Sequence, residues 1–426
     1  MKKIFLLFFV FLLSVSSVIS QVNFDDYFYS KSLRIDYNLV GNNVKTEVYL
    51  VDLKQETFWG GSQKNLVDKF NYGEYRVMVY DSAYGKLIYS RGYTSLFQEW
   101  RATAEAKYLS RSYYETVLIP YPKNAVRIVI QARNKELIFE DKFTFNVDPR
   151  DYLIIKDNSL PITTKKIFYS GDPKQKLDVV IIPEGYSKDD LEKMNRDAEK
   201  FASTMFGCSP YKENKDNFNI WLVQAISQES GVDIPHQNIW KNTVLNSHFY
   251  TFRIDRYLMT TDIKSLRDLA GLVPYDQIVI IVNSEKYGGG GVYNYYSMYT
   301  ADNRYMDYVA VHEFGHAFAC LADEYYDSEV AVEDYINLKV EPYEPNITTL
   351  VDFDKKWKNL VDKNTPIPTP PEKQYWDKVG VFEGGSYVAK GIFRPMYDCT
   401  MKSIKYDSFC RVCYKALDDM IKFYSE

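Results

Sequence analysis

The chain has 426 residues, of which 46% are hydrophobic and 26% are charged, and its formal net charge is −5. This length predicts two or three domains, and the composition is that of a globular protein. The mild negative charge leaves no strongly basic region, which argues against a nucleic-acid-binding protein, so we expect no nucleic-acid partner.

Residues 1–20 have the pattern of a secretory signal peptide. Two lysines precede an apolar run from Ile4 to Leu13, and small residues follow up to Ser20. The apolar run is shorter than the roughly 20 residues that a membrane-spanning helix needs. We therefore predict cleavage near Ser20, export to the periplasm, the cell surface or the medium, and no membrane span in the mature chain.

Residues 21–158 are dominated by strand-like segments. Short runs rich in Val, Ile, Tyr and Phe alternate with polar residues, and turn residues such as Gly41 and Pro122 separate them. Several such strands in one region predict an antiparallel β-sandwich. The segments are VKTEVYLVDL, YRVMVYD, KLIYSRGY, YYETVLIPYP, AVRIVIQARN and ELIFEDKFTFNV.

Residues 159–426 form a second predicted domain, which follows the linker-like sequence DNSLPITTKK. The continuous apolar run at 177–183 is typical of a buried strand, and 218–227 and 277–284 are further strand candidates. A segment with helical periodicity follows the first of these strands. Strands that alternate with helices indicate an α/β domain, so the fold class that we predict for the whole chain is α+β.

The second domain contains the sequence HEFGH at residues 312–316. On a helix, His312 and His316 lie one turn apart on the same face, so both imidazoles can reach one metal ion. Glu313 lies beside them, where it can hold a water molecule bound to that ion, as in zinc peptidases. A helix this apolar buries its histidines, and a metal ion supplies the partner that they need. We therefore predict one catalytic Zn²⁺ ion at His312 and His316, with Glu313 as the general base.

A catalytic zinc ion wants a third protein ligand, and the spacing leaves its identity open. In the metzincin pattern H-E-x-x-H-x-x-G-x-x-H, the glycine and the last histidine would fall at Ala319 and Ala322. Asp323 follows directly, but an unbroken helix would carry it about 10 Å beyond His316. Asp323 is therefore a ligand only if the helix ends near Cys320 and the chain bends back. Its short separation from the histidines favours it, because little loop closure is required.

Three glutamates remain alternatives for the third ligand. Glu324 is adjacent to Asp323 and one carbon longer, whereas Glu329 and Glu333 lie where a second helix can present them. The residues alone favour Asp323 but do not eliminate these three.

The sequence HEFGHAFACLADEY, residues 312–325, resembles the H-E-x-G-H-x-F-x-x-L-A-D-E-Y signature of the bacterial IgA-peptidase family of zinc metallopeptidases. Further segments resemble blocks of that family in the same order, over about residues 175 to 415. The N-terminal strands are similar to the β-sandwich that precedes the peptidase domain in the family. The resemblance implies that the second domain is a metzincin-like zinc peptidase domain.

The same resemblance implies that His312, His316 and Asp323 are the zinc ligands and that Glu313 is catalytic. The expected activity is that of a secreted zinc metalloendopeptidase whose partner is a protein or peptide substrate, such as immunoglobulin A or another host or environmental protein. Two alternatives are a secreted binding or adhesion protein with an inactive peptidase-like domain, and a zinc hydrolase of glycopeptides. The intact Glu313 favours an enzyme, although fold and reaction transfer between relatives better than substrate does.

Several further residues have expected roles near the metal. The resemblance suggests that Met401 forms an apolar floor under the ion, and Tyr397 is a candidate donor to an oxyanion. Residues 292–297 are a candidate edge strand that pairs with an extended substrate. The glycines of 287–291 allow a close backbone approach or a flexible loop.

Three of the five cysteines, Cys399, Cys410 and Cys413, lie near one another in sequence. They suggest a structural zinc site, but Asp398 is a poor fourth ligand. Because an exported chain permits disulfides, we predict instead a disulfide from Cys399 to Cys410 or Cys413. Cys320 is expected to be either an apolar residue of the buried helix or a further partner of these cysteines.

Overall fold

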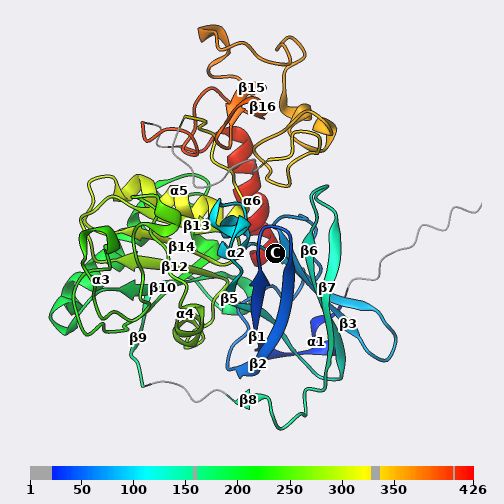
Figure 1. Cartoon of the computed structure of the whole chain (residues 1–426), viewed down its shortest axis with the longest axis vertical. Helices are drawn as coiled ribbons and strands as arrows, with labels where there is room; N and C mark the ends of the chain where they lie inside the picture. The colour runs from blue at the N-terminus through cyan, green and yellow to red at the C-terminus, as the bar shows by residue number, and fades with distance from the viewer. Residues whose placement is uncertain (1–21, 157–160, 328–335, 406–407) are drawn as a thin grey trace, which may run out of the picture.

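The computed structural model describes residues 22–156, 161–327, 336–405 and 408–426. Figure 1 shows a β-rich N-terminal part, a part in which helices cover a mixed sheet, and a C-terminal segment that lies above both. The predicted α+β class is confirmed. The predicted signal peptide (1–20) and the predicted domain boundary between residues 158 and 159 lie outside the described residues.

The N-terminal part consists of two four-stranded sheets. Every strand pairing in them is antiparallel except that of β2 with β8. Alternate residues of a strand point to opposite faces, and in β3 the burial alternates at every position. The buried residues of both sheets, Ile35 and Val77 among them, contribute to one apolar core. The first sheet has the order β5 (Arg111–Pro122), β1 (Phe28–Gly41), β2 (Thr46–Glu56) and β8 (Ile155–Lys156), and the second has the order β4 (Leu87–Tyr93), β3 (Tyr75–Asp81), β6 (Val126–Arg133) and β7 (Phe139–Val147).

A six-stranded mixed sheet lies at the centre of the second part. Its four inner strands run parallel, and each edge strand is antiparallel to its neighbour. All eight residues of β10 are buried, as expected for a strand that is covered on both faces. The order is β13 (Gly289–Val292), β14 (Tyr296–Thr300), β12 (Gln277–Val282), β10 (Leu177–Glu184), β11 (Phe218–Val223) and β9 (Thr164–Tyr169).

Three helices of the second part position the site. Helix α3 (Leu191–Gly207) follows a capping box formed by Ser187 and Asp190, and it packs against α5 (Met306–Ala319). Helix α5 lies against β13 and β14, and helix α6 (Arg411–Ser425) packs against α5. The shorter helices are α1 (Phe24–Tyr27), α2 (Leu96–Arg101) and α4 (Ile263–Ala270). No helix within the described ranges has both the length and the apolar character to cross a bilayer.

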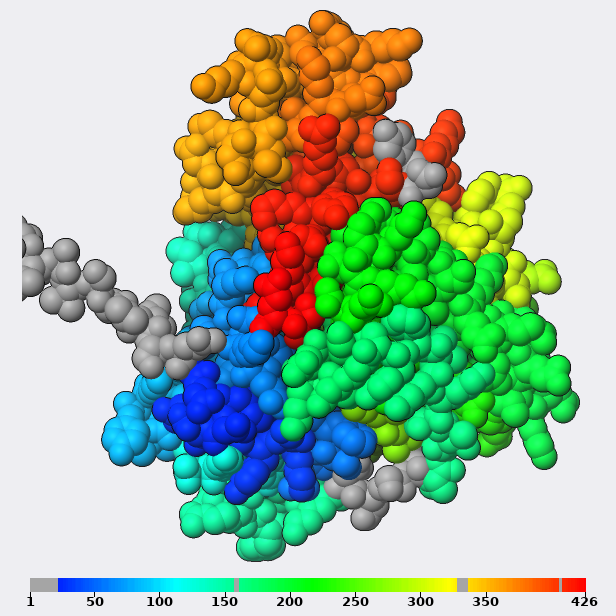
Figure 2. Space-filling view, turned by 180° about the vertical axis from the view of Figure 1, so that it is seen from behind, coloured from blue at the N-terminus to red at the C-terminus, as the bar shows by residue number. Residues whose placement is uncertain are grey.

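The described residues between α5 and α6 are mostly loops, as the sequence predicts. They contain short 3-10 turns and one hairpin, made of β15 (Phe382–Gly385) and β16 (Val388–Arg394). Helix α6 returns from this segment and lies between the N-terminal part and the mixed-sheet part (Figure 2). Near its end, Arg91 of β4 donates a hydrogen bond of 2.7 Å to the Tyr424 hydroxyl. The C-terminal helix therefore connects all three parts of the molecule.

Candidate metal centre and active site

Helix α5 ends at Ala319, and the chain turns sharply at the following residue, Cys320. Cys320 has a left-handed backbone, with φ of 54° and ψ of 35°, and its N–H donates to the carbonyl oxygen of His316 at 3.1 Å. This is the usual geometry of a helix C-terminus, although glycine normally occupies the left-handed position. The turn sends the following residues back along the helix. The bend that a zinc ligand at Asp323 requires is therefore present without a glycine.

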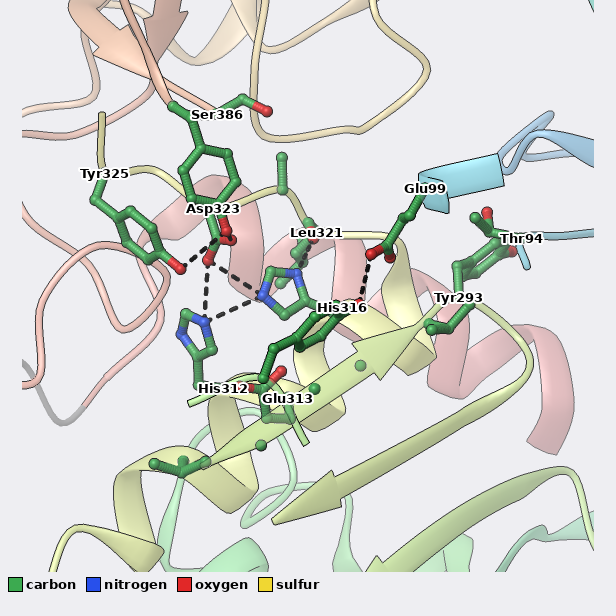
Figure 3. A pocket seen from close by; sticks show the side chains of 18 of the residues that line it. Thr94, Glu99, Tyr293, His312, Glu313, His316, Leu321, Asp323, Tyr325 and Ser386 are labelled. Carbon is green, nitrogen blue, oxygen red and sulfur yellow. Dashed lines mark hydrogen bonds and ion pairs between the residues drawn. The ribbon is translucent and has the colours of Figure 1, made fainter. Parts of the chain in front are cut away.

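Three potential ligand atoms meet beyond this bend (Figure 3). The Nε2 atoms of His312 and His316 are 3.1 Å apart, and the Oδ1 atom of Asp323 lies 3.1 Å from the first and 3.2 Å from the second. Ligand atoms about 2.05 Å from a tetrahedral zinc ion are about 3.3 Å from one another. The triangle formed by these atoms therefore has the size that a zinc ion requires.

The opposite nitrogens of both imidazoles bond to backbone carbonyl groups. His312 Nδ1 lies 3.0 Å from the oxygen of Thr400, and His316 Nδ1 lies 2.5 Å from the oxygen of Leu321. A carbonyl oxygen only accepts, so each Nδ1 carries a proton, and in the neutral imidazole each Nε2 presents a lone pair. Such contacts fix the tautomer and the ring orientation of metal-binding histidines.

The hairpin between β15 and β16 holds the carboxylate of Asp323. The Tyr387 hydroxyl donates to Asp323 Oδ2 at 2.5 Å, and the Ser386 N–H donates to the carbonyl oxygen of Asp323 at 2.8 Å. The Tyr325 hydroxyl lies 3.2 Å from that of Tyr387. Oδ2 is thus occupied by Tyr387, whereas Oδ1 faces the two histidines. Sequence reasoning missed Tyr387, whose only signal was its place in a segment that resembles a family block.

Asp323 and His316 shift each other's pKa in opposite directions. Burial opposes ionisation of Asp323, but the charge and hydrogen bonds of the two histidines outweigh it and hold the pKa of Asp323 well below its usual range. Burial likewise disfavours the imidazolium of His316, but the Asp323 carboxylate raises the pKa of His316 to about 9. A metal ion therefore competes with a proton for His316 at neutral pH.

Glu313 lies beside the three ligand atoms and lines the same pocket (Figure 3). Burial raises the pKa of Glu313, while the neighbouring His312 and His316 lower it. The glycines of β13 allow this strand to lie directly against the helix. A Cβ atom on Gly291 would lie 2.3 Å from the carbonyl oxygen of Glu313, and one on Gly289 would lie 3.1 Å from its Cγ. These glycines are therefore needed because the backbone of β13 lies so close to helix α5.

The pocket is built by all three parts of the molecule. Glu99 of α2 belongs to the N-terminal part, Arg256 and Tyr287 belong to the mixed-sheet part, and Tyr387 belongs to the hairpin. Burial raises the pKa of Glu99 to about 7, although the hydroxyl of Tyr257, 2.5 Å away, donates a hydrogen bond to it. The N-terminal part thus supplies a further carboxyl group to the wall of the site, beside those of Glu313, Asp323 and Glu344.

Two family models match the chain. The model described as IgA Peptidase M64 matches residues 166–378 and 371–421, and the model described as Peptidase M64 N-terminus matches residues 23–144. The chain belongs to the IgA-peptidase family. It is therefore a peptidase, its family depends on a metal ion, and its substrate is a protein or peptide. No curated protein matches the sequence.

The alternative third ligands of this IgA-peptidase family member have different positions. Glu324 turns away from the histidines, and its Oε1 atom accepts a hydrogen bond from Asn346 at 3.0 Å. Glu329 and Glu333 lie outside the described residues. Among the candidates that the structure describes, Asp323 is the one that meets both histidines.

The other expected residues are placed with mixed results. Met401 is fully buried, and its sulfur would lie 3.2 Å from a Cβ atom on Gly315, between the two histidines of α5. Its position is compatible with an apolar floor below the ligands. Tyr397 instead stacks on Trp376 at a centroid distance of 4.5 Å and does not line the pocket. The expectation of an oxyanion donor at Tyr397 is therefore wrong for this arrangement.

Two further expectations require correction. The predicted edge strand at 292–297 spans the end of β13, a turn and the start of β14, and the edge itself is β13. The predicted disulfide is not formed, because all five cysteines of the chain are free. The sulfurs of Cys399 and Cys413 are 3.9 Å apart, whereas a disulfide requires about 2.05 Å.

Proposed function

We propose that this member of the IgA-peptidase family is an exported zinc metalloendopeptidase with a metzincin-like catalytic domain. The observation that carries the proposal is the triangle of His312 Nε2, His316 Nε2 and Asp323 Oδ1, which lies beside Glu313 in an open pocket. Three protein ligands leave a fourth position for water or substrate, which distinguishes a catalytic zinc site from a structural one.

The metal, when bound, supplies an activated water molecule and polarises the carbonyl group of the scissile peptide bond. Glu313 accepts the proton of the attacking water and passes it to the leaving amine, as a general base and then a general acid. Its raised pKa, caused by burial, brings its proton affinity closer to that required near neutral pH. Thr400 and Leu321 hold the two imidazoles in the tautomer that this chemistry needs.

The edge of the mixed sheet offers a place for an extended substrate. The backbone of Gly289 is bonded to Arg256 and Leu258, so this end of β13 is covered. The same edge continues at Gly291, which lines the pocket next to Glu313 and His316. A substrate that pairs there as a further strand would place its backbone across the ligand triangle.

The proposal is tested with the purified mature protein and a mixed protein substrate that includes immunoglobulin A. We expect one cleavage activity that disappears after zinc chelation and returns on addition of Zn²⁺. A control incubation with Mg²⁺ should not restore it, because imidazole ligands favour zinc over magnesium. A protein that holds zinc at His312 and His316 but cleaves no substrate would contradict the proposal and would favour a binding or adhesion protein.

A further inference from the structure

A second group of metal-binding side chains lies on the other side of the turn that carries Asp323. One potential ligand atom from each of Glu324, Cys399, Cys410 and Cys413 lies within 4.8 Å of all the others. All four residues are buried, and none is more than 4% exposed. This cluster is separate from the catalytic triangle, and the peptidase chemistry does not use it.

The backbone around the cysteines favours negatively charged sulfur. The N–H of Cys410 points to the sulfur of Cys399 at 3.2 Å, and the N–H of Cys413 points to the sulfur of Cys410 at 3.5 Å. Cys410 is the N-cap of α6, where the helix dipole stabilises a thiolate. The buried guanidinium of Arg394 adds positive charge near Glu324. These groups offset part of the charge that four anionic ligands would bring.

Glu324 provides the observation that points to a cation. Its Oε1 atom accepts from Asn346 at 3.0 Å and lies 3.2 Å from the sulfur of Cys413. Its Oε2 atom is buried and has no hydrogen-bond partner among the residues that the structure describes. A buried carboxylate oxygen without a donor is costly, and a bound cation removes that cost.

The spacing of the sulfurs fits a metal ion and not a disulfide. Two thiolates about 2.3 Å from a tetrahedral zinc ion are about 3.8 Å apart, and the sulfurs of Cys399 and Cys413 are 3.9 Å apart. A disulfide within the cluster would also leave one cysteine and Glu324 without a partner. We propose that Glu324, Cys399, Cys410 and Cys413 bind a second zinc ion, which is structural because all four positions are filled by protein.

This second ion would fix two chain segments that position the catalytic ligands. Glu324 directly follows the ligand Asp323, and Cys399 directly precedes Thr400, whose carbonyl group orients His312. The N–H of Glu324 also donates to the carbonyl oxygen of Met401 at 2.8 Å. Glu324 and the cysteines are thus positioning residues for the catalytic ligands, and they do not touch the substrate.

The proposal is tested by zinc content and zinc X-ray absorption on the full mature protein. We expect two zinc ions per chain and sulfur scattering at about 2.3 Å, because the catalytic triangle contains no sulfur. The His312→Ala variant should lose one ion and keep the sulfur signal. The Cys413→Ser variant should lose the sulfur signal, whereas Cys208→Ser, at a buried cysteine outside the cluster, should keep both ions.

The positioning role has its own measurement. The Glu324→Gln variant keeps the shape of the side chain but removes its charge, and we expect the affinity of the catalytic site for zinc to fall roughly tenfold. This affinity is measured by competition with a chelator, using circular dichroism to verify the fold. An unchanged catalytic affinity after loss of the second zinc ion would contradict the positioning role.

Two results would overturn the second site. One is a wild-type protein with zinc but no sulfur scattering, and the other is a titration of the denatured, unreduced protein that finds three thiols and not five. Both measurements use the wild type, so they decide the matter even if Cys413→Ser does not fold. Failure of the peptidase proposal is distinguishable, because the sulfur signal does not depend on cleavage.

Discussion

Asp323 and Glu324 are neighbours in the chain, but their side chains belong to two clusters with different properties. Asp323 joins His312 and His316 at the wall of an open pocket that also contains Glu313. Glu324 joins three cysteines in the interior, where it is fully buried. Three nitrogen and oxygen donors beside a pocket suit catalysis, whereas four donors that enclose the ion suit structure.

The difference arises from one short segment after helix α5. From Cys320 to Tyr326 the chain has no regular helix or strand. The Asp323 side chain contacts the histidines, whereas that of Glu324 contacts Cys413. Asn346 fixes this segment by accepting from the N–H of Ala322 at 2.7 Å and donating to its carbonyl oxygen at 2.9 Å. Two adjacent carboxylates therefore serve two sites, and a shift of one residue would leave one of the sites without its carboxylate.

The largest expected effect is loss of catalysis with the three zinc ligands unchanged. Glu313→Gln should lower kcat/KM for protein cleavage by about 10²- to 10⁴-fold, because it removes the general base. The zinc content should stay at the wild-type level, as elemental analysis would show. The exposed Glu285 offers a matched control, and Glu285→Gln should leave both quantities unchanged. Full activity in Glu313→Gln would remove this residue from the mechanism.

The next effect separates the two neighbouring carboxylates. Asp323→Asn should weaken zinc binding at the catalytic site by at least about 100-fold, more than the loss expected for a residue that only orients a ligand. The sulfur-bound ion should remain, which X-ray absorption would reveal. Asp327→Asn, at an exposed position, is the control. Retention of two ions and full activity in Asp323→Asn would show that the third ligand lies elsewhere.

A smaller effect is expected at the hydroxyl that holds Asp323. Tyr387→Phe removes the hydrogen bond to Oδ2 and should lower the zinc affinity of the catalytic site by about tenfold. Chelator competition measures this change, and the sulfur-bound ion should be unaffected. Tyr397→Phe, outside the pocket, serves as the control. Equal affinities for the two variants would mean that Tyr387 does not support the ligand.

The smallest expected effect is on the pH dependence of stability, and it comes from Glu99 in the wall of the catalytic pocket. Burial raises the pKa of Glu99 from 4.5 to about 7, so the folded state holds this proton more tightly than the unfolded chain. The wild type should therefore lose stability as the pH rises from 4.5 through 7 and level off above that range. In Glu99→Gln this contribution is absent, and denaturant titrations across the range should show a flatter profile. An identical pH profile of stability for both proteins would show that Glu99 does not contribute to it.

The sequence predicts what depends on local pattern. The HEFGH helix, the buried strand at 177–183 and the capping box before α3 are visible because their residues are close in the chain. The turn at Cys320 was not visible, because cysteine in place of glycine gives no signal for a left-handed residue. Asp323 was favoured by its short spacing and by the resemblance, without a visible cause for the bend.

What the sequence could not provide were partners far apart in the chain. Tyr387 lies 64 residues from Asp323, and Cys413 lies 89 residues from Glu324. Sequence reasoning therefore offered the poor ligand Asp398 to the cysteines and considered Glu324 only for the catalytic ion. Residues so far apart produce no recognisable pattern in the sequence, because only the folded hairpin and helix bring them together.

The residues that position the catalytic ligands lie near the C-terminus, so they are synthesised after the ligands themselves. The HEFGH segment leaves the ribosome well before Thr400, whose carbonyl orients His312, and before Cys410 and Cys413. A nascent or prematurely terminated chain thus contains the HEFGH signature but lacks the C-terminal residues that position its histidines. We therefore expect cleavage activity only after the final helix has been made and folded.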